Sequence, residues 1–110
     1  MSGPAEPDAI VVLVTAPPEL APELARLMVE WRVAACVVTT PVRSVYRWQG
    51  EIREEQEVQL VAKTTRDRFP ALEALVRQHH EYEVPEILAL PVVEGSAAYL
   101  AWVRAETRAP

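Results

Sequence analysis

Short apolar runs alternate along the chain with longer stretches in which apolar residues recur every three or four positions. The short runs are rich in β-branched residues, which is typical of strands buried in a sheet. They predict four strands over residues 9–15, 34–40 with a continuation at 45–48, 51–62 and 86–92. The second of them is interrupted at Pro41, as a bulge or as a feature of an edge strand. The amphipathic stretches predict helices over residues 18–32 and 65–80, and a last helix after Gly95-Ser96.

The predicted order of elements is β-α-β-β-α-β followed by a helix. This order is that of the ferredoxin-like motif, in which a four-stranded antiparallel sheet carries two helices on one face. Gln49-Gly50, between the second and third predicted strands, is typical of a tight turn. We therefore expect an α+β ferredoxin-like domain in which these two strands form one long hairpin.

The length of 110 residues predicts a single domain. We expect a flexible tail over residues 1–8, one domain over residues 9–105 and a short C-terminal tail over residues 106–110. The long hairpin would leave unpaired edges and the aromatic side chains of Tyr46 and Trp48 exposed, which soluble monomers avoid. We therefore expect that other copies of the same chain cover it.

The charge balance narrows the classes of partner. The net charge is −5, from 11 basic and 16 acidic residues. Nucleic acids and anionic membrane surfaces both favour basic partners, so neither is expected to bind. No apolar run approaches the roughly 20 residues that span a bilayer, and Met1–Asp8 does not read as a signal peptide. We expect a cytoplasmic protein.

Catalytic motifs are not apparent in the sequence. It contains no nucleophile elbow, no glycine-rich phosphate loop and no zinc-protease helix. Only three glycines are present, which makes a backbone cradle for a nucleotide hard to build. Since no acid, base and nucleophile converge, we expect a protein that is not an enzyme.

Five stretches, taken together and in order, resemble the CutA divalent-cation tolerance family. They run from about residue 10 to residue 104, and they are Arg32-Val33-Ala34-Ala35-Cys36-Val37, Ser44-Val45-Tyr46-Arg47-Trp48-Gln49-Gly50-Glu51-Ile52, Lys63-Thr64-Thr65-Arg66-Asp67-Arg68-Phe69, His80-Glu81-Tyr82-Glu83-Val84-Pro85-Glu86-Ile87 and Tyr99-Leu100-Ala101-Trp102. The resemblance implies a ferredoxin-like homotrimer similar in architecture to the PII signalling proteins. It also implies a role in tolerance of copper and other divalent metals, with no obligatory cofactor and no established reaction.

The candidate metal ligands are Cys36, His80 and Glu83. Cys36 matches the family cysteine discussed as a copper ligand, and a thiolate suits soft ions such as Cu(I). The alternative is a small buried side chain in an apolar strand, where free cysteine usually lies. Imidazole and carboxylate suit Cu(II) or Zn(II), but a histidine near a helix end also complements the helix dipole. The adjacent His79 falls on the apolar stripe of its helix and is expected to pack there.

A second set of residues is expected to line either a ligand cleft or the trimer interface. Tyrosine and tryptophan are enriched at interfaces, which favours the second alternative. The set is Tyr46, Trp48, Lys63, Tyr82 and Trp102. The nearby acidic residues Glu51, Glu54, Glu55 and Glu57 offer oxygen ligands for a hard divalent ion. Without a calcium-loop pattern, they are better explained as a solvated or interface-facing arm.

Two functions follow from these observations. The first is a trimeric divalent-cation tolerance protein that binds copper or another divalent ion weakly. The second is a PII-like trimeric scaffold that binds a small molecule or a protein partner and for which metal binding is incidental.

Overall fold

The structure is a computed structural model that describes residues 8–108. Of the predicted N-terminal tail, only Asp8 is within these residues, and residues 109–110 of the predicted C-terminal tail also lie outside them. The described residues contain no helix that is both long and apolar enough to cross a membrane. The elements are, in chain order, β1 Ala9–Ala16, α1 Ala21–Glu30, β2 Cys36–Trp48, β3 Glu51–Thr65, the short 3-10 helix η1 Arg66–Arg68, α2 Phe69–His79, β4 Ile87–Pro91 and α3 Ala97–Glu106.

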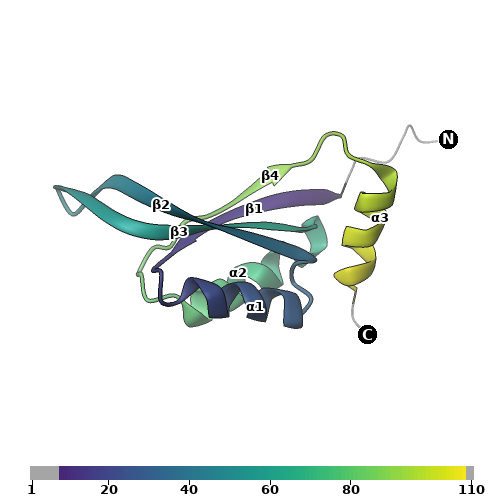
Figure 1. Ribbon diagram of the computed structural model, residues 1–110, viewed down its shortest axis with the longest axis horizontal. Helices are drawn as coiled ribbons and strands as arrows, with labels where there is room; N and C mark the ends of the chain where they lie inside the picture. The colour runs from purple at the N-terminus through teal and green to yellow at the C-terminus, as the bar shows by residue number, and fades with distance from the viewer. Residues whose placement is uncertain (1–7, 109–110) are drawn as a thin grey trace.

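The four strands form one antiparallel sheet in the order β2-β3-β1-β4. Helices α1 and α2 lie side by side under one face of this sheet (Figure 1). Helix α3 packs at one end of the molecule, against β3 and β1. The order and the placement of α1 and α2 confirm the predicted α+β ferredoxin-like arrangement.

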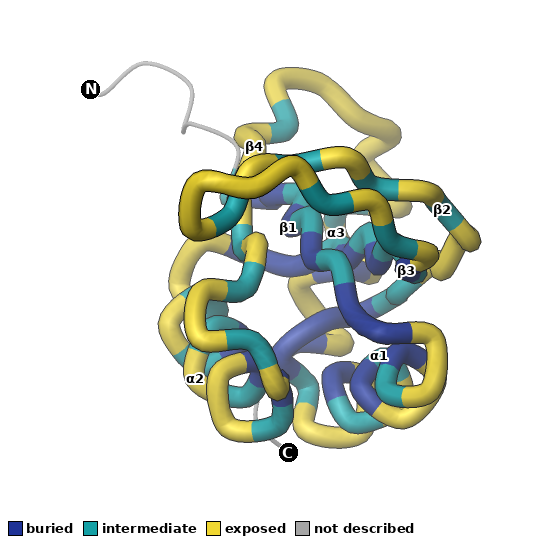
Figure 2. Tube along the Cα trace, turned by 90° about the vertical axis from the view of Figure 1, so that its left-hand side faces the viewer, coloured by how far each residue is buried: buried dark blue, intermediate teal, exposed yellow. Residues whose placement is uncertain are grey.

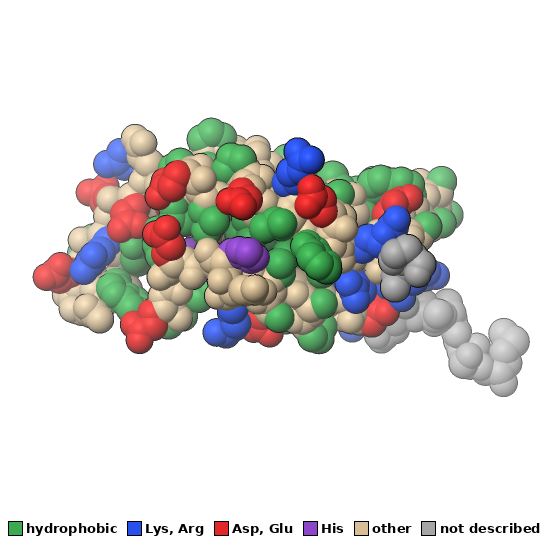
Figure 3. Space-filling model, turned by 90° about the horizontal axis from the view of Figure 1, so that it is seen from below, with side chains coloured by type: hydrophobic (Ala, Val, Ile, Leu, Met, Phe, Trp, Pro, Cys, Tyr) green, Lys and Arg blue, Asp and Glu red, His purple; other side chains and the backbone are tan. Residues whose placement is uncertain are grey.

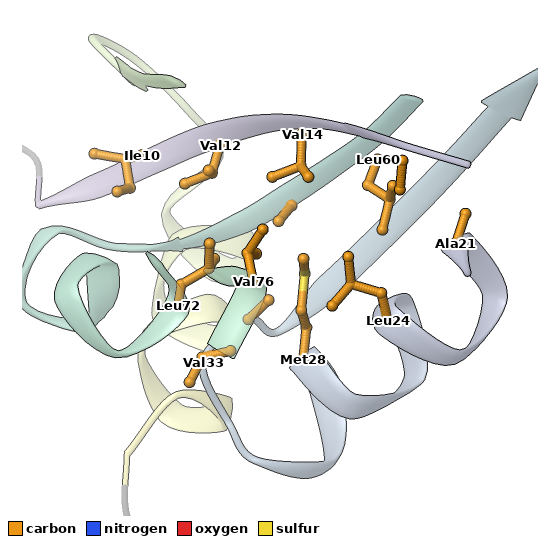
Figure 4. Packing of buried hydrophobic residues seen from close by; sticks show 13 residues of the cluster. Ile10, Val12, Val14, Ala21, Leu24, Met28, Val33, Leu60, Leu72 and Val76 are labelled. Carbon is orange, nitrogen blue, oxygen red and sulfur yellow. The ribbon is translucent and has the colours of Figure 1, made fainter. Parts of the chain in front are cut away.

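The core fills the space between the sheet and the two helices (Figure 4). Val12 and Val14 of β1 alternate with residues that face away, as the period of two along a strand requires. Leu24 and Met28 of α1 are four positions apart and meet them from the helix side, together with Leu72 of α2. All five side chains are fully buried. The apolar positions of the strand and of the two helices therefore face one common core.

Strands β2 and β3 form a hairpin that extends beyond the rest of the sheet. The pairing runs without interruption from Cys36 opposite Lys63 to Trp48 opposite Glu51. Gln49 (φ 51°) and Gly50 (φ 81°) close it as a two-residue turn with positive φ at both positions, which confirms the predicted tight turn. The hairpin tip is mostly exposed (Figure 2), and the radius of gyration of 15.2 Å exceeds the value of about 13 Å for a compact chain of this length.

Two details of the sequence prediction are wrong. Pro41 does not interrupt the second strand but pairs in register with Val58. Of the two readings of Pro41, the edge strand is confirmed: β2 lies at the edge of the sheet, where half of the N–H groups point away from the neighbouring strand. The first helix ends at Glu30 rather than at residue 32, because Arg32 adopts a left-handed conformation (φ 57°) and its N–H bonds to the Val29 carbonyl, which closes the helix end.

The packed structure continues through the end of α3. Thr107 is fully buried, and its hydroxyl donates to the Val103 carbonyl. Arg108 donates two hydrogen bonds to the carboxylate of Asp67, at 2.7 and 2.9 Å. The domain limits at residues 9 and 105 stay a prediction.

Candidate functional site

A groove of about 690 Å³ lies at the hairpin end of the molecule, where β3 runs past the end of β1. The loop between α2 and β4, residues 80–86, lies alongside this part of β3. We call this space the hairpin groove. It is lined by Tyr46 and Trp48 of β2, by Arg53, Glu55 and Glu57 of β3, by Thr15 at the end of β1, and by Tyr82, Glu83 and Glu86 of the loop.

His80 fixes this loop to the sheet. Its Nε2 lies 2.7 Å from the carbonyl oxygen of Thr15, and its Nδ1 accepts a hydrogen bond from the N–H of Tyr82 at 3.1 Å. Since Nδ1 accepts, the proton of the neutral ring belongs on Nε2, which donates to Thr15. Both ring nitrogens are therefore engaged with the backbone, and the side chain is buried.

Tyr82 contacts both His80 and the residues of the hairpin groove. Its ring contacts that of His80 at a tilt of 57°, with the ring centroids 4.6 Å apart, and its hydroxyl donates to Oε2 of Glu55 at 3.2 Å. Burial, followed by the negative charge of Glu57 and the hydrogen bond to Glu55, raises the pKa of Tyr82 above its ordinary value. Tyr82 therefore keeps its proton and remains a hydrogen-bond donor in the groove.

Two charged groups in the groove each carry one buried polar atom without a hydrogen-bond partner among the described residues. Glu57 is only 4% exposed, and its Oε2 has no hydrogen-bond partner among the described residues. The Nε of Arg53 is also buried without a partner, while its Nη2 reaches Glu51 at 3.8 Å. Buried polar atoms are normally hydrogen-bonded, so the groove contains unused capacity for polar contacts. Figure 3 shows acidic side chains gathered at the end of the molecule that carries the hairpin.

Cys36 lies at the other end of the sheet. It is the first residue of β2, it is half-buried and it is opposite Lys63 on β3. Tyr99 of α3 is close to it: burial, followed by the neighbouring Cys36 thiol, raises the pKa of Tyr99. The Tyr99 ring stacks on Trp102, with the ring centroids 5.6 Å apart.

The three predicted metal ligands do not meet within one chain. Lys63 pairs with Val11 of β1 as well as with Cys36, whereas His80 contacts Thr15, four residues further along β1. Four residues correspond to about 13 Å along the strand, and β2 and β1 are about 10 Å apart across β3. Ligands of one ion each lie about 2 Å from it. Among residues 8–108, no three His, Cys, Asp or Glu side chains are placed to hold a metal ion together.

The structure divides the predicted cleft or interface residues into two groups. Tyr46, Trp48 and Tyr82 line the hairpin groove, together with the predicted ligand Glu83. The other two, Lys63 and Trp102, lie at the opposite end with Cys36.

The sequence reasoning missed Thr15, Arg53 and the inward role of Glu57. Part of the signal was available, because a turn at Gln49-Gly50 fixes the register and places Arg53, Glu55 and Glu57 on the same face as Tyr46. The contact of His80 with Thr15 joins residues 65 positions apart. No local pattern predicts it.

Comparisons with known proteins agree on one family. The sequence profile of the family described as CutA1 divalent ion tolerance protein matches residues 10–106. The divalent-cation tolerance protein CutA of Thermus thermophilus is 50% identical over 99 residues, which are 88% of this chain and 96% of that protein. That of Citrobacter koseri is 42% identical over 104 residues, which are 93% of this chain and 90% of that protein.

Solved structures show the same likeness in three dimensions. The divalent cation tolerance protein of Thermus thermophilus superposes with a TM-score of 0.88 at 49% identity, covering 91% of this chain and 99% of that one. The PII-like protein CutA of a Nostoc species superposes with a TM-score of 0.87 at 35% identity, covering 90% and 97%. A CutA from Archaeoglobus fulgidus, described as periplasmic, superposes with a TM-score of 0.88 at 30% identity, covering 91% and 99%. The chain belongs to the CutA1 divalent ion tolerance protein family.

Proposed function

We propose that this chain contributes to the tolerance of cells to divalent cations, as a homotrimer that binds copper or another divalent ion weakly. The observation that carries the proposal is the match of residues 10–106 to the family, together with relatives that are named for divalent-cation tolerance. The family is named for tolerance rather than for a reaction, so the proposed role is binding and not catalysis. We propose a cytoplasmic location, to be tested by cell fractionation, because a single free thiol suits a reducing compartment.

The sheet face opposite α1 and α2 supports assembly into a homotrimer. Alternation along the strands places Val38 of β2 and Leu88 and Leu90 of β4 on this face, and the three side chains are 47%, 56% and 47% exposed. The sheet also ends in two unpaired edges, β2 and β4, of which β2 is 13 residues long. Exposed apolar strands of this kind favour pairing with another chain.

Sedimentation equilibrium tests the assembly. We expect a species of three times the chain mass of 12.3 kDa, and we expect Leu88→Glu to convert it to smaller species by placing a charge in the contact. A monomer of the unaltered chain at micromolar concentration would contradict the homotrimer.

The three predicted ligands differ in how readily they can bind an ion. Cys36 is half-buried and unbridged, so its thiolate needs little rearrangement. His80 can coordinate only after one of its two backbone hydrogen bonds breaks. Glu83 is exposed in the loop and far from Cys36. We place Cys36 first, His80 second and Glu83 third as ligands to test.

A growth assay tests the role in cells. A bacterial strain without its own family member would be complemented with the chain, with Cys36→Ser and with His79→Ala as a matched control. We expect the unaltered chain and the control to restore growth in elevated copper, and Cys36→Ser to restore less. The same growth with and without the chain would contradict the proposal.

A second candidate function is a PII-like scaffold that binds a small molecule, with metal binding incidental. The hairpin groove favours it, because a buried carboxylate, whose Oε2 has no partner among residues 8–108, lines a space of small-molecule size.

A further inference from the structure

The strongest unexplained feature of the hairpin groove is the carboxylate of Glu57. It lies on β3, is 4% exposed and lines the groove, and its buried Oε2 has no hydrogen-bond partner among residues 8–108. A buried carboxylate of this kind is unfavourable unless a cation or donor meets it. The neighbouring Glu55 already receives the Tyr82 hydroxyl. The Oε2 atom of Glu57 therefore remains an acceptor without a partner among the described residues.

The charges around Glu57 favour a cation as the missing partner. The groove is lined by four carboxylates, those of Glu55, Glu57, Glu83 and Glu86, against the single guanidinium of Arg53. The Nη2 of Arg53 is directed to Glu51, which is outside the groove lining. An anionic or neutral occupant would leave this excess of negative charge uncompensated.

The size and walls of the groove distinguish an organic cation from a metal ion. A volume of about 690 Å³ is within the range of small-molecule sites and far larger than a bare ion needs. No three candidate ligand side chains of the described residues converge on a metal position. The rings of Tyr46, Trp48 and Tyr82 supply aromatic walls instead. Such walls bind the carbon body of a ligand and attract its positive charge.

We propose that the hairpin groove binds a small organic cation, namely a protonated primary amine with an apolar or aromatic body. Its ammonium group donates to Glu57 and its body lies against Tyr46 and Trp48. His80 acts as a positioning residue, since it holds the loop that supplies Tyr82. The inference rests on the second candidate function, in which this groove is a ligand site, and it is independent of metal binding at Cys36.

Isothermal titration of the full chain in its natural assembly tests the proposal. The probe is phenethylammonium, and the matched probe is 2-phenylethanol, which has nearly the same shape without the charge. The variants are Glu57→Gln, which keeps the shape of the side chain, and Glu54→Gln as a control. Glu54 lies three residues earlier on β3, is exposed and pairs with Arg43 outside the groove.

We expect phenethylammonium to bind saturably to the unaltered chain. The alcohol should bind to this chain about tenfold or more weakly than the amine, and the amine should bind to Glu57→Gln about tenfold or more weakly than to the unaltered chain. Each change removes the charge-assisted contact. Glu54→Gln should bind as the unaltered chain does. Glu55→Gln provides a second variant, with a smaller expected loss, in case Glu57→Gln does not fold.

Three results would overturn the proposal. One is the absence of saturable binding with a dissociation constant below about 1 mM, which would indicate that a basic side chain of another copy already occupies the groove. Equal binding of the alcohol is the second. The third is displacement of the amine by Zn(II) in Cys36→Ser, which would assign the groove to metal. Since copper binding is measured separately at Cys36, a failure here leaves the proposed role in cation tolerance standing.

Discussion

Strand β3 passes through two regions of opposite character within a few residues. Leu60 and Ala62 are fully buried between the sheet and helices α1 and α2, whereas Glu55 and Glu57 line the hairpin groove. In the helix-covered region, apolar side chains fill the space and no charge needs a partner. In the hairpin region, carboxylates and aromatic rings enclose an unfilled space. The first arrangement stabilises the fold, and the second leaves unsatisfied groups that a ligand can use.

The largest difference between the two regions concerns stability. We expect Leu24→Ala to reduce the free energy of unfolding by about 3 kcal/mol, because it leaves a cavity in the fully buried core. Ile52→Ala, near the hairpin turn where the side chain is 68% exposed, should change it by less than about 1 kcal/mol. Urea denaturation measures both. Equal losses of stability in the two variants would contradict this difference, since they would show that the hairpin end is packed as closely as the core.

The contact of His80 with Thr15 gives the second largest expected effect on stability. We expect His80→Ala to reduce the free energy of unfolding by about 2 kcal/mol, because it leaves the Thr15 carbonyl and the Tyr82 N–H without their partner. His79→Ala removes a neighbouring ring that makes neither bond and should change it by less than about 0.5 kcal/mol. Hydrogen exchange should also show faster opening of residues 80–86 in His80→Ala only. Similar protection in both variants would show that His80 does not hold the loop.

Replacing Glu57 is expected to increase the stability of the chain rather than to reduce it. We expect Glu57→Gln to increase the free energy of unfolding by about 1 kcal/mol, because it removes a buried charge whose Oε2 has no partner within the described part of the chain. Glu54→Gln, at the exposed position, should leave it within about 0.5 kcal/mol. Thermal denaturation at neutral pH and constant protein concentration measures both. A destabilised Glu57→Gln would indicate that another copy of the chain supplies a cation to Glu57 in the assembly.

The smallest expected effect is at the opposite end of the molecule. The Arg108 guanidinium and the Thr65 hydroxyl hold the pKa of Asp67 well below its ordinary value of 3.8. Because the pKa is lower in the folded chain, this stabilisation is fully present above pH 3.8 and is lost as the pH falls through the folded value. Both side chains of the pair are exposed, so its contribution is less than about 1 kcal/mol.

Denaturation of Asp67→Asn at two pH values checks this sign. We expect Asp67→Asn to be less stable than the unaltered chain at pH 6, and the difference to be smaller at about pH 2, below the unfolded pKa. Glu19→Gln, which replaces an exposed carboxylate in the turn before α1, is the control. A difference of the same size at both pH values would show that Asp67 acts by something other than its charge.

Most of the fold could be predicted from the sequence, because local patterns determine it. The turn at Gln49-Gly50 was evident because it requires positive φ, and the apolar spacing of Leu24 and Met28 predicted the buried face of α1. The interruption predicted at Pro41 was wrong, whereas the edge position that it suggested is confirmed, since an edge strand tolerates a proline within its pairing.

Less of the candidate site could be predicted, because it depends on contacts between distant parts of the chain. The sequence indicated Tyr46, Trp48 and Tyr82, but as alternatives between a cleft and an interface. That His80 bonds to Thr15 depends on how the α2–β4 loop returns past the end of β1. Glu57 is buried and Glu54 is exposed, and this difference depends on which face of β3 the loop covers. Neither fact is visible in residue spacing.

The proposed role in cation tolerance is tested most directly by a calorimetric titration of the purified chain with Cu(I), Cu(II) and Zn(II), performed in parallel on Cys36→Ser. We predict weak, saturable binding at a fixed ratio of ions to subunits, reduced at least about tenfold in Cys36→Ser while the assembly is unchanged. Heats that do not saturate, or that are the same in Cys36→Ser, would contradict metal binding at this thiol.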